Sequence, residues 1–214
     1  NVGLDAEAIM MAAFPNPDFF WLDSGYMDIG IKTCASTAGS EYFNQNDPER
    51  AKQMLEEMGY DGEEFKIMVT RDYDHHYNAG VVIHEQLRQL GVNATLEVYD
   101  WPSLLDKREN DFSAWDAFIT TSSIVSTPPQ LIALSPTWAG GVNDDKVGEL
   151  MRAIETAPTI EEARALWDEL QLYAWEELLP VIPFGGYYDL SAYNTRIQGV
   201  TTLTGAIFWN VSKT

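Results

Sequence analysis

The stretch from Asp47 to Trp101 constrains the fold most, because helix and strand patterns alternate along it. Asp47 can accept hydrogen bonds from the first N–H groups of a helix, and Pro48 suits the first turn of that helix. Gly59 supplies the positive φ with which helices often end. Between these signals the apolar residues recur at helical spacing and predict one apolar stripe: Ala51, Met54, Leu55 and Met58.

A strand, a second helix and a second strand follow in the same stretch. Apolar and polar residues alternate over 65–69 and again over 92–99, and a helix is expected over 77–90, ended by Gly91. Two strands joined through a helix form a βαβ unit, which is usually parallel and right-handed. The sequence therefore predicts an α/β fold with a mixed sheet flanked by helices.

Further elements are expected on both sides of this stretch. Caps at Asp5, Asp100 and Asn143 or Asp144 each predict a helix, and Thr159 predicts a long helix that reaches about residue 177. The strands expected after the βαβ unit are 115–121, 181–185 and 207–211. The aromatic and glycine-rich segment 18–40 follows no period, and a loop this long is usually functional or mobile.

Composition excludes several classes of protein. The 214 residues suffice for an independent core, and no apolar run of about 18 residues is present to span a bilayer. With 13 basic and 33 acidic residues the net charge is −20, which disfavours nucleic acids and anionic membrane surfaces as partners. The acidity is typical of a soluble exported protein. Cys34 is the only cysteine, so an internal disulfide is excluded.

Several motifs, in order, resemble one protein family. A helix with AKQMLEEMGYDG precedes a strand, a second helix ends in QLRQLGVN, and LEVYDWPSLLDKR follows. LDAEAIMMAAF near the start and FWNV near the end fit the same pattern. Together they resemble the peptide/nickel family of ABC-transporter extracellular solute-binding proteins, over nearly all of the chain.

The resemblance implies a fold, a location and partners. In this family the LDAEAI helix lies well inside the protein, and this chain begins at Asn1 with no signal peptide. We therefore expect residues 1–214 to be a single α/β lobe, excised from a longer two-lobed protein whose N-terminal lobe is missing. The implied partners are a small-molecule solute and an ABC permease, and the implied location is the bacterial periplasm or cell surface.

The sequence lacks recognisable motifs of catalysis and metal binding. It contains no GxSxG, HExxH or GxxxxGK motif. His84 has no second histidine at zinc-helix spacing, and the adjacent His75 and His76 cannot easily face one ion from a helix. Neither an enzyme activity nor a metal or cofactor is expected. A carboxylate-dependent hydrolase and a protein-interaction module remain as alternatives.

Ligand contacts are expected after two strands, because ligands of α/β sheets gather at the carboxyl ends of strands. Arg71, Asp72 and Tyr73 follow the first strand and precede a helix N-terminus, which favours anions. Ser122, Ser123 and their neighbours follow the strand expected at 115–121, either facing a neutral polar ligand or forming a self-bonded turn.

The family resemblance adds two candidates, Val125 and Arg108, and the ring of Trp138 suggests a third. WDAFITTSSIVSTPP matches the cleft strand and loop of the family, but Ser122 and Val125 stand where peptide binders have a tryptophan and an aspartate. A free ammonium would lack its carboxylate at Val125, which implies a solute other than an ordinary peptide. Arg108 matches an arginine that reaches a ligand carboxylate, or is a surface residue ending a helix. Trp138 is a stacking surface or a core residue. Oligosaccharide, opine and modified peptide all remain open.

Overall fold

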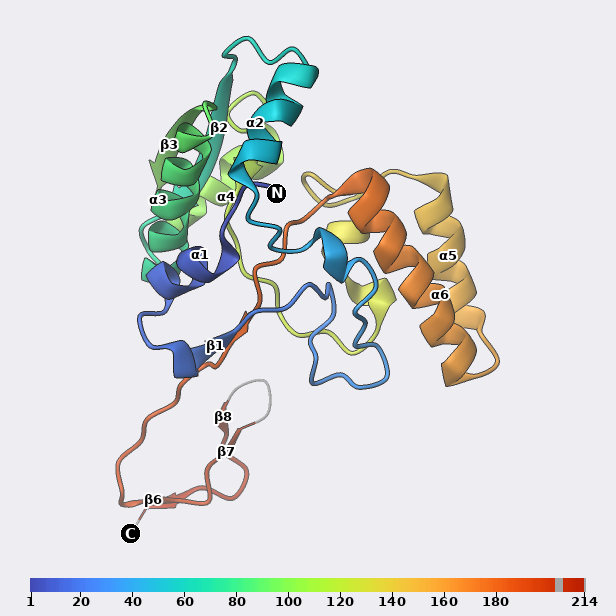
Figure 1. Ribbon diagram of the computed structural model, residues 1–214. Coiled ribbons are helices and arrows are strands. Elements are labelled where there is room, and N and C mark those ends of the chain that lie inside the picture. Colours follow the sequence, from blue (N-terminus) through green and yellow to red (C-terminus); the bar gives the residue numbers. More distant parts are fainter. Residues whose placement is uncertain (203–205, 214) are drawn as a thin grey trace.

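The computed structural model describes residues 1–202 and 206–213. Its centre is a parallel sheet in the order β3-β2-β4, made of β2 (Glu64–Thr70), β3 (Asn93–Tyr99) and β4 (Ala117–Phe118). β2 pairs with β3 along its whole length, and Thr70 lies opposite Tyr99 at the carboxyl end. This sheet occupies one half of the molecule, and a pair of helices occupies the other half (Figure 1).

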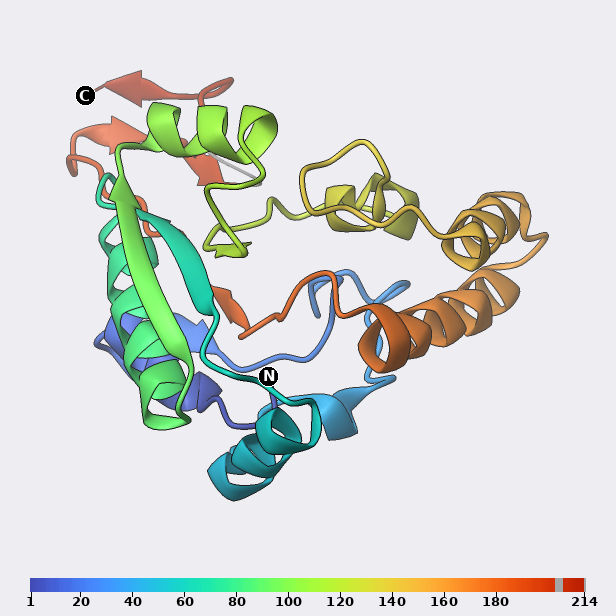
Figure 2. The ribbon, with the colours of Figure 1, turned by 90° about the horizontal axis from the view of Figure 1, so that it is seen from above.

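Helices cover both faces of this sheet. α3 (Asp74–Gln89) connects β2 to β3, and α4 (Trp101–Asn110) then connects β3 to β4 on the other side of β2. Right-handed crossovers in opposite directions place their helices on opposite faces, as Figure 2 shows. α1 (Ala6–Ala13) packs against α3. The buried residues of this half form the first core: Leu4, Ile9, Ile67, Ala79, Ile83 and Ala94.

The predicted caps start the helices. Asp47 Oδ1 accepts the Arg50 N–H at 2.9 Å at the start of α2 (Pro48–Glu57). Gly59 has a φ of +74°, as expected. The apolar stripe is not buried at its end, since the helix ends at Glu57 and Met58 is 80% exposed. The other predicted caps also accept backbone N–H groups: Asp5, Asp100, Asp144 and Thr159.

The second half is helical and has its own core. α5 (Asp145–Thr156) and α6 (Ile160–Tyr173) pack side by side (Figure 1). α6 continues as a π turn over Ala174–Leu178, and Leu179 then takes a left-handed conformation before Pro180. The buried residues are Met27, Leu131, Leu134, Val147, Leu150, Ile154, Trp167, Leu170 and Ala174. Short 3-10 helices lie at Pro17–Phe19, Ser40–Tyr42, Pro128–Gln130 and Ile132–Leu134.

The irregular segment 22–40 is held by α6. The amide of Gln171, which is fully buried, donates to the Ser36 carbonyl at 3.2 Å and the Ala38 carbonyl at 2.8 Å, and accepts the Tyr26 N–H at 3.2 Å. The Trp175 Nε1–H donates to the Ser24 carbonyl at 3.1 Å. The segment follows no period because its backbone bonds to side chains of a distant helix.

The remaining strands are short antiparallel pairs, separate from the parallel sheet. β1 (Phe20–Trp21) pairs with β5 (Gly186–Tyr187). The C-terminal part, at the bottom of Figure 1, holds β6 (Ile197–Gln198) with β9 (Ser212–Lys213), and β7 (Thr201–Thr202) with β8 (Ala206–Ile207).

Three strand predictions need correction. The strand expected at 115–121 is shorter: β4 covers Ala117 and Phe118, and the N–H groups of Asp116 and Ile119 on either side donate to the carbonyls of Lys66 and Met68 in β2. The apolar segment 181–185 forms no strand, because no other segment within residues 1–202 and 206–213 pairs with it before β5 begins at Gly186. The strand expected at 207–211 is also wrong, since the chain turns at Trp209 and Asn210. Within the described residues no helix is both long and apolar enough to cross a membrane.

Candidate ligand-binding site

A crevice opens at the carboxyl end of the parallel sheet. β2 and β3 end side by side, and their following segments turn to helices on opposite faces, which leaves a gap between the two strand ends. The gap has a volume of about 340 Å³ and is open to solvent. Its lining residues come from both strand ends: Arg71, Asp72, Val98, Tyr99 and Asp100.

Arg71 brings a positive charge to this crevice. Its guanidinium lies 4.9 Å from the centre of the Tyr77 ring, and Nη2 is 3.4 Å from the Tyr77 hydroxyl. The Arg71 N–H donates to the Tyr99 carbonyl at 3.3 Å, which continues the pairing of the two strands. Among the described residues no carboxylate forms an ion pair with Arg71. The guanidinium therefore keeps donors for an anionic group.

Two carboxylates face the crevice and also hold its walls. Asp72 Oδ2 accepts the Trp101 N–H at 2.7 Å, which ties the end of β2 to the start of α4. Asp100 caps α4 by accepting the Ser103 N–H at 3.0 Å and the Ser103 hydroxyl at 2.9 Å. These hydrogen bonds lower the pKa of Asp100, so it remains ionised at neutral pH. The crevice thus offers groups of both charges.

Tyr73 lies beside the crevice, outside its lining. Its ring packs edge-on against Trp101, with centres 5.4 Å apart, and against His76 at 5.2 Å. It is 41% exposed. Tyr73 therefore supports the wall that Asp72 and Trp101 form.

Arg108 and Trp138 meet in a different place. The Arg108 guanidinium lies 5.5 Å from the Phe118 ring and 5.6 Å from the Trp138 ring, and its Nε donates to Glu109 at 3.0 Å. The Arg108 side chain is only 14% exposed. Since α4 rises about 1.5 Å per residue, Arg108 is roughly 10 Å along the helix from Trp101 at the crevice. The structure does not bring Arg108 and Arg71 together.

The loop after β4 is separate again. Ser122 and Ser123 are exposed, and the Ser122 hydroxyl donates to the Ser123 carbonyl at 3.5 Å, as in a self-bonded turn. Val125 is half-buried and packs against the helical core. Whether Arg108, Trp138 or this loop contacts a solute stays a prediction.

Three crevice residues were not among the predicted site residues: Val98, Tyr99 and Asp100. The sequence places Asp100 directly after an expected strand, where site residues are expected. Its predicted role as a helix cap already accounts for an aspartate at this position, so the sequence does not single it out as a site residue. Only the register that sets Tyr99 opposite Thr70 shows that these residues share an edge with Arg71.

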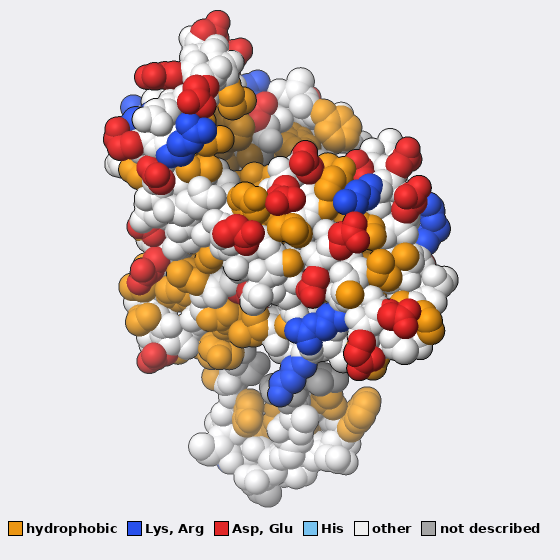
Figure 3. Space-filling view, turned by 45° about the vertical axis from the view of Figure 1, so that its right-hand side comes forward, with side chains coloured by type: hydrophobic (Ala, Val, Ile, Leu, Met, Phe, Trp, Pro, Cys, Tyr) orange, Lys and Arg blue, Asp and Glu red, His pale blue; other side chains and the backbone are white. Residues whose placement is uncertain are grey.

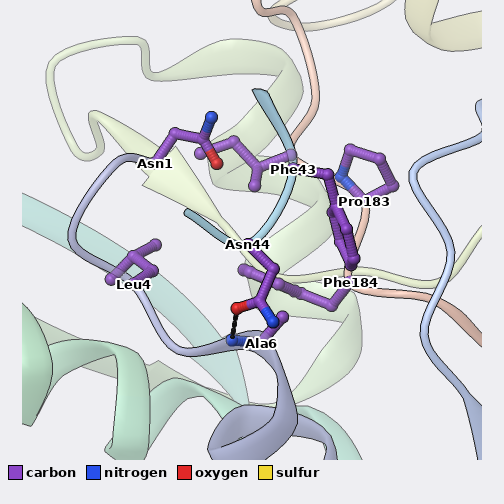
Figure 4. A pocket seen from close by; sticks show the side chains of 8 residues that line it. Asn1, Leu4, Ala6, Phe43, Asn44, Pro183 and Phe184 are labelled. Carbon is purple, nitrogen blue, oxygen red and sulfur yellow. Dashed lines mark hydrogen bonds between the residues drawn. The ribbon is translucent and has the colours of Figure 1, made fainter. Parts of the chain in front are cut away.

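A second hollow, shown in Figure 4, is too narrow for a solute. It lies where the N-terminal segment, the residues before α2 and the segment 182–184 meet. Asn44 Oδ1 accepts the Ala6 N–H there at 2.8 Å. The hollow has no room even for a water molecule.

Surface charge and metal-ligand geometry are also informative. On the face in Figure 3 acidic side chains are scattered widely, and basic ones are few and interspersed among them. That face offers no basic stripe for nucleic acid.

No group of three or more His, Cys, Asp or Glu residues within the described part of the chain is arranged to hold a metal ion.

Comparison with known proteins identifies the family. The model of the middle region of family 5 of the bacterial extracellular solute-binding proteins matches residues 7–146. The chain belongs to this family. A probable peptide ABC transporter periplasmic-binding protein of Sinorhizobium fredii is 31% identical to it over 222 residues. The match covers 98% of this chain and 41% of that relative, so the chain spans less than half of its relative's length.

Solved structures confirm an α/β fold of the periplasmic-binding-protein kind. A dipeptide-binding protein from Pseudoalteromonas, in complex with Met-Leu, superposes with a TM-score of 0.80 at 18% identity, over 99% of this chain and 43% of that one. DppA from Helicobacter pylori, with the peptide STSA, gives 0.78 at 17% identity, over 100% and 42%. AgaA from Agrobacterium tumefaciens, with agropinic acid, gives 0.69 at 20% identity, over 87% and 39%.

Proposed function

We propose that these residues form one lobe of a two-lobed solute-binding protein that captures a small polar solute and delivers it to an ABC permease. Family membership supports this, as does the coverage of relatives, which are more than twice as long. The protein would work in the periplasm or at the cell surface. Solute binding would favour the closed arrangement of the lobes, and no bond would be made or broken.

The crevice at the ends of β2 and β3 is the proposed contact with the solute. The observation that carries this proposal is Arg71, a guanidinium without a carboxylate partner in the described part of the chain, at the mouth of an open gap of about 340 Å³. A carboxylate on the solute would accept two hydrogen bonds from it. Asp72 and Asp100 would face any cationic or hydroxyl group nearby.

The edge of β4 supports a solute with a peptide-like or opine-like amide. β4 lies at the sheet edge, and the exposed segment 121–124 beyond it makes no backbone–backbone hydrogen bond within the described residues. Such an edge can pair with an extended backbone. Sugar-like solutes offer no backbone groups of this kind.

Native mass spectrometry of the complete two-lobed protein, gently purified from its host, tests the proposal. We expect a discrete extra mass that is lost on unfolding. The Arg71→Ala variant should bind the recovered solute roughly 10–100-fold more weakly, because one charge-assisted contact contributes about 1.5–3 kcal/mol.

Arg152→Ala is the matched control, since Arg152 is exposed on α5 in the helical half. It should bind like the wild type. Equal weakening by both substitutions would assign the effect to net charge. An unchanged affinity in Arg71→Ala would remove the crevice from the site. If no solute is found and screens cause no lobe closure, the transport function fails.

A further inference from the structure

His76 is buried in an unusual way behind the crevice. It is 3% exposed, and neither ring nitrogen has a hydrogen-bond partner among the described residues. Three aromatic rings contact it, with distances between ring centres of 5.2 Å for Tyr73, 5.9 Å for Trp101 and 4.5 Å for His75. A buried imidazole without partners is costly, so its position calls for an explanation.

The two large rings around His76 lie beside the crevice, next to the lining residues Asp72 and Asp100 in the chain. Tyr73 directly follows Asp72, and the Trp101 N–H donates to Asp72 Oδ2 at 2.7 Å. The Tyr73 and Trp101 rings also contact each other. His76 therefore packs behind the point where the β2 end and the α4 start are tied together.

This packing suits only the neutral imidazole. His76 lies in the first turn of α3, where the partial positive charge of the helix end opposes a cation. Burial, with a smaller contribution from His75, lowers the pKa of His76 to about 4. The other groups facing the cluster are the aromatic rings of Tyr187 in β5 and Phe14 after α1, which both pack against His75. Asp74 acts on His75, opposing the burial that lowers the pKa of His75.

We propose that His76 is a positioning residue whose protonation opens the Tyr73–Trp101 wall, so that acid releases the solute from the crevice. This inference rests on the proposed function. An imidazolium needs water or an acceptor, and neither ring nitrogen of His76 has a partner among the described residues, so the surrounding rings must move to admit one. The Trp101 backbone N–H donates to Asp72, which lines the crevice, so a movement that carries the Trp101 backbone weakens this bond.

The coupling has a measurable size. If the solute binds only the form with a neutral His76, the dissociation constant rises up to tenfold for each pH unit below the midpoint of His76. By the same linkage, bound solute must shift that midpoint to lower pH.

NMR of the complete protein tests the wall without any solute. With 5-fluorotryptophan incorporated, the signal assigned to Trp101 should change with pH at the midpoint of the His76 ring signal, below pH 5. His76→Gln should abolish this transition. His84→Gln, on the outer part of α3 where the ring bonds to the Ala94 carbonyl, should keep it.

A solute arm then separates this inference from the proposed function. Met-Leu is the first probe, followed by any solute recovered from the host, and the pH dependence of its affinity is measured for the wild type and His76→Gln. If the Trp101 signal shows the same pH dependence in the wild type and in His76→Gln, the inference is overturned even if solute binds. An equal pH dependence of affinity in both proteins overturns it as well. If no solute binds at any pH, the proposed function and the claim of acid release are both contradicted. The NMR experiment still measures whether protonation of His76 moves Trp101.

Discussion

Gln171 shows how one buried polar residue organises a long irregular segment. Its amide bonds to two carbonyls and one N–H of segment 22–40. Gln171→Ala should lower the free energy of unfolding by roughly 2–4 kcal/mol, because buried backbone groups lose their partners. Gln53→Ala, at an exposed position of α2, should change it by less than about 0.5 kcal/mol. Urea denaturation measures both, and equal effects would contradict this role for Gln171.

His76 also makes the stability of the fold depend on pH. Its pKa is about 4 in the folded protein and 6.5 ordinarily, so the unfolded chain binds more protons between these values. The contribution of His76 to the free energy of unfolding is therefore complete above pH 6.5. It is lost as the pH drops towards 4, by roughly 3 kcal/mol in total. Denaturation of wild type and His76→Phe at pH 7 and pH 5 checks this. The two proteins should respond differently, and parallel losses would argue against it.

At the scale of elements, the pairing of β1 with β5 depends on a glycine. A Cβ on Gly186 would lie 2.2 Å from the Trp21 ring, whereas a Cβ on Gly59 would meet nothing within 4 Å. Gly186→Ala should therefore cost roughly 2–3 kcal/mol of stability, because the strands must separate. Gly59→Ala should cost only about 1–2 kcal/mol, for its positive φ.

Hydrogen exchange localises the effect of that substitution. The Tyr188 N–H donates to the Phe19 carbonyl at 2.9 Å beside this strand pair. Its exchange should accelerate in Gly186→Ala and stay unchanged in Gly59→Ala. Unchanged exchange in Gly186→Ala would show that the strands accommodate a methyl group.

Elements with local signals were the predictable ones. Asp47 and Asp100 start their helices as expected, because a cap needs only its own next turn. Strands beyond the βαβ unit were predicted poorly, because strand pairing depends on distant partners. The segment after Ile119 leaves the sheet, and the apolar segment 181–185 has no partner strand among the described residues, although both have strand-like sequences.

The candidate site was predicted in part for the same reason. Arg71 and Asp72 follow a recognisable strand, and both line the crevice. Tyr99 and Asp100 join them through the register of two strands, which no local pattern encodes. Val125 packs into the helical core, a contact between segments far apart in sequence. Its position relative to a solute cannot be deduced from its place in a motif.

On the scale of the whole molecule, the proposed function predicts that the two lobes close around a solute. The complete protein should contract in small-angle scattering when its solute is added, because the closed arrangement buries the solute between two lobes. Arg71→Ala should need a higher solute concentration for the same contraction. Full contraction of this variant at the wild-type concentration would indicate that Arg71 makes no contact.

The most direct measurement is a crystal structure of the complete protein with its captured solute. We expect an anionic group of the solute within hydrogen-bond distance of the Arg71 guanidinium, between the ends of β2 and β3. Asp72 and Asp100 should flank it. A solute bound instead at Arg108 and Trp138, with the crevice occupied only by water, would contradict the assignment of the site.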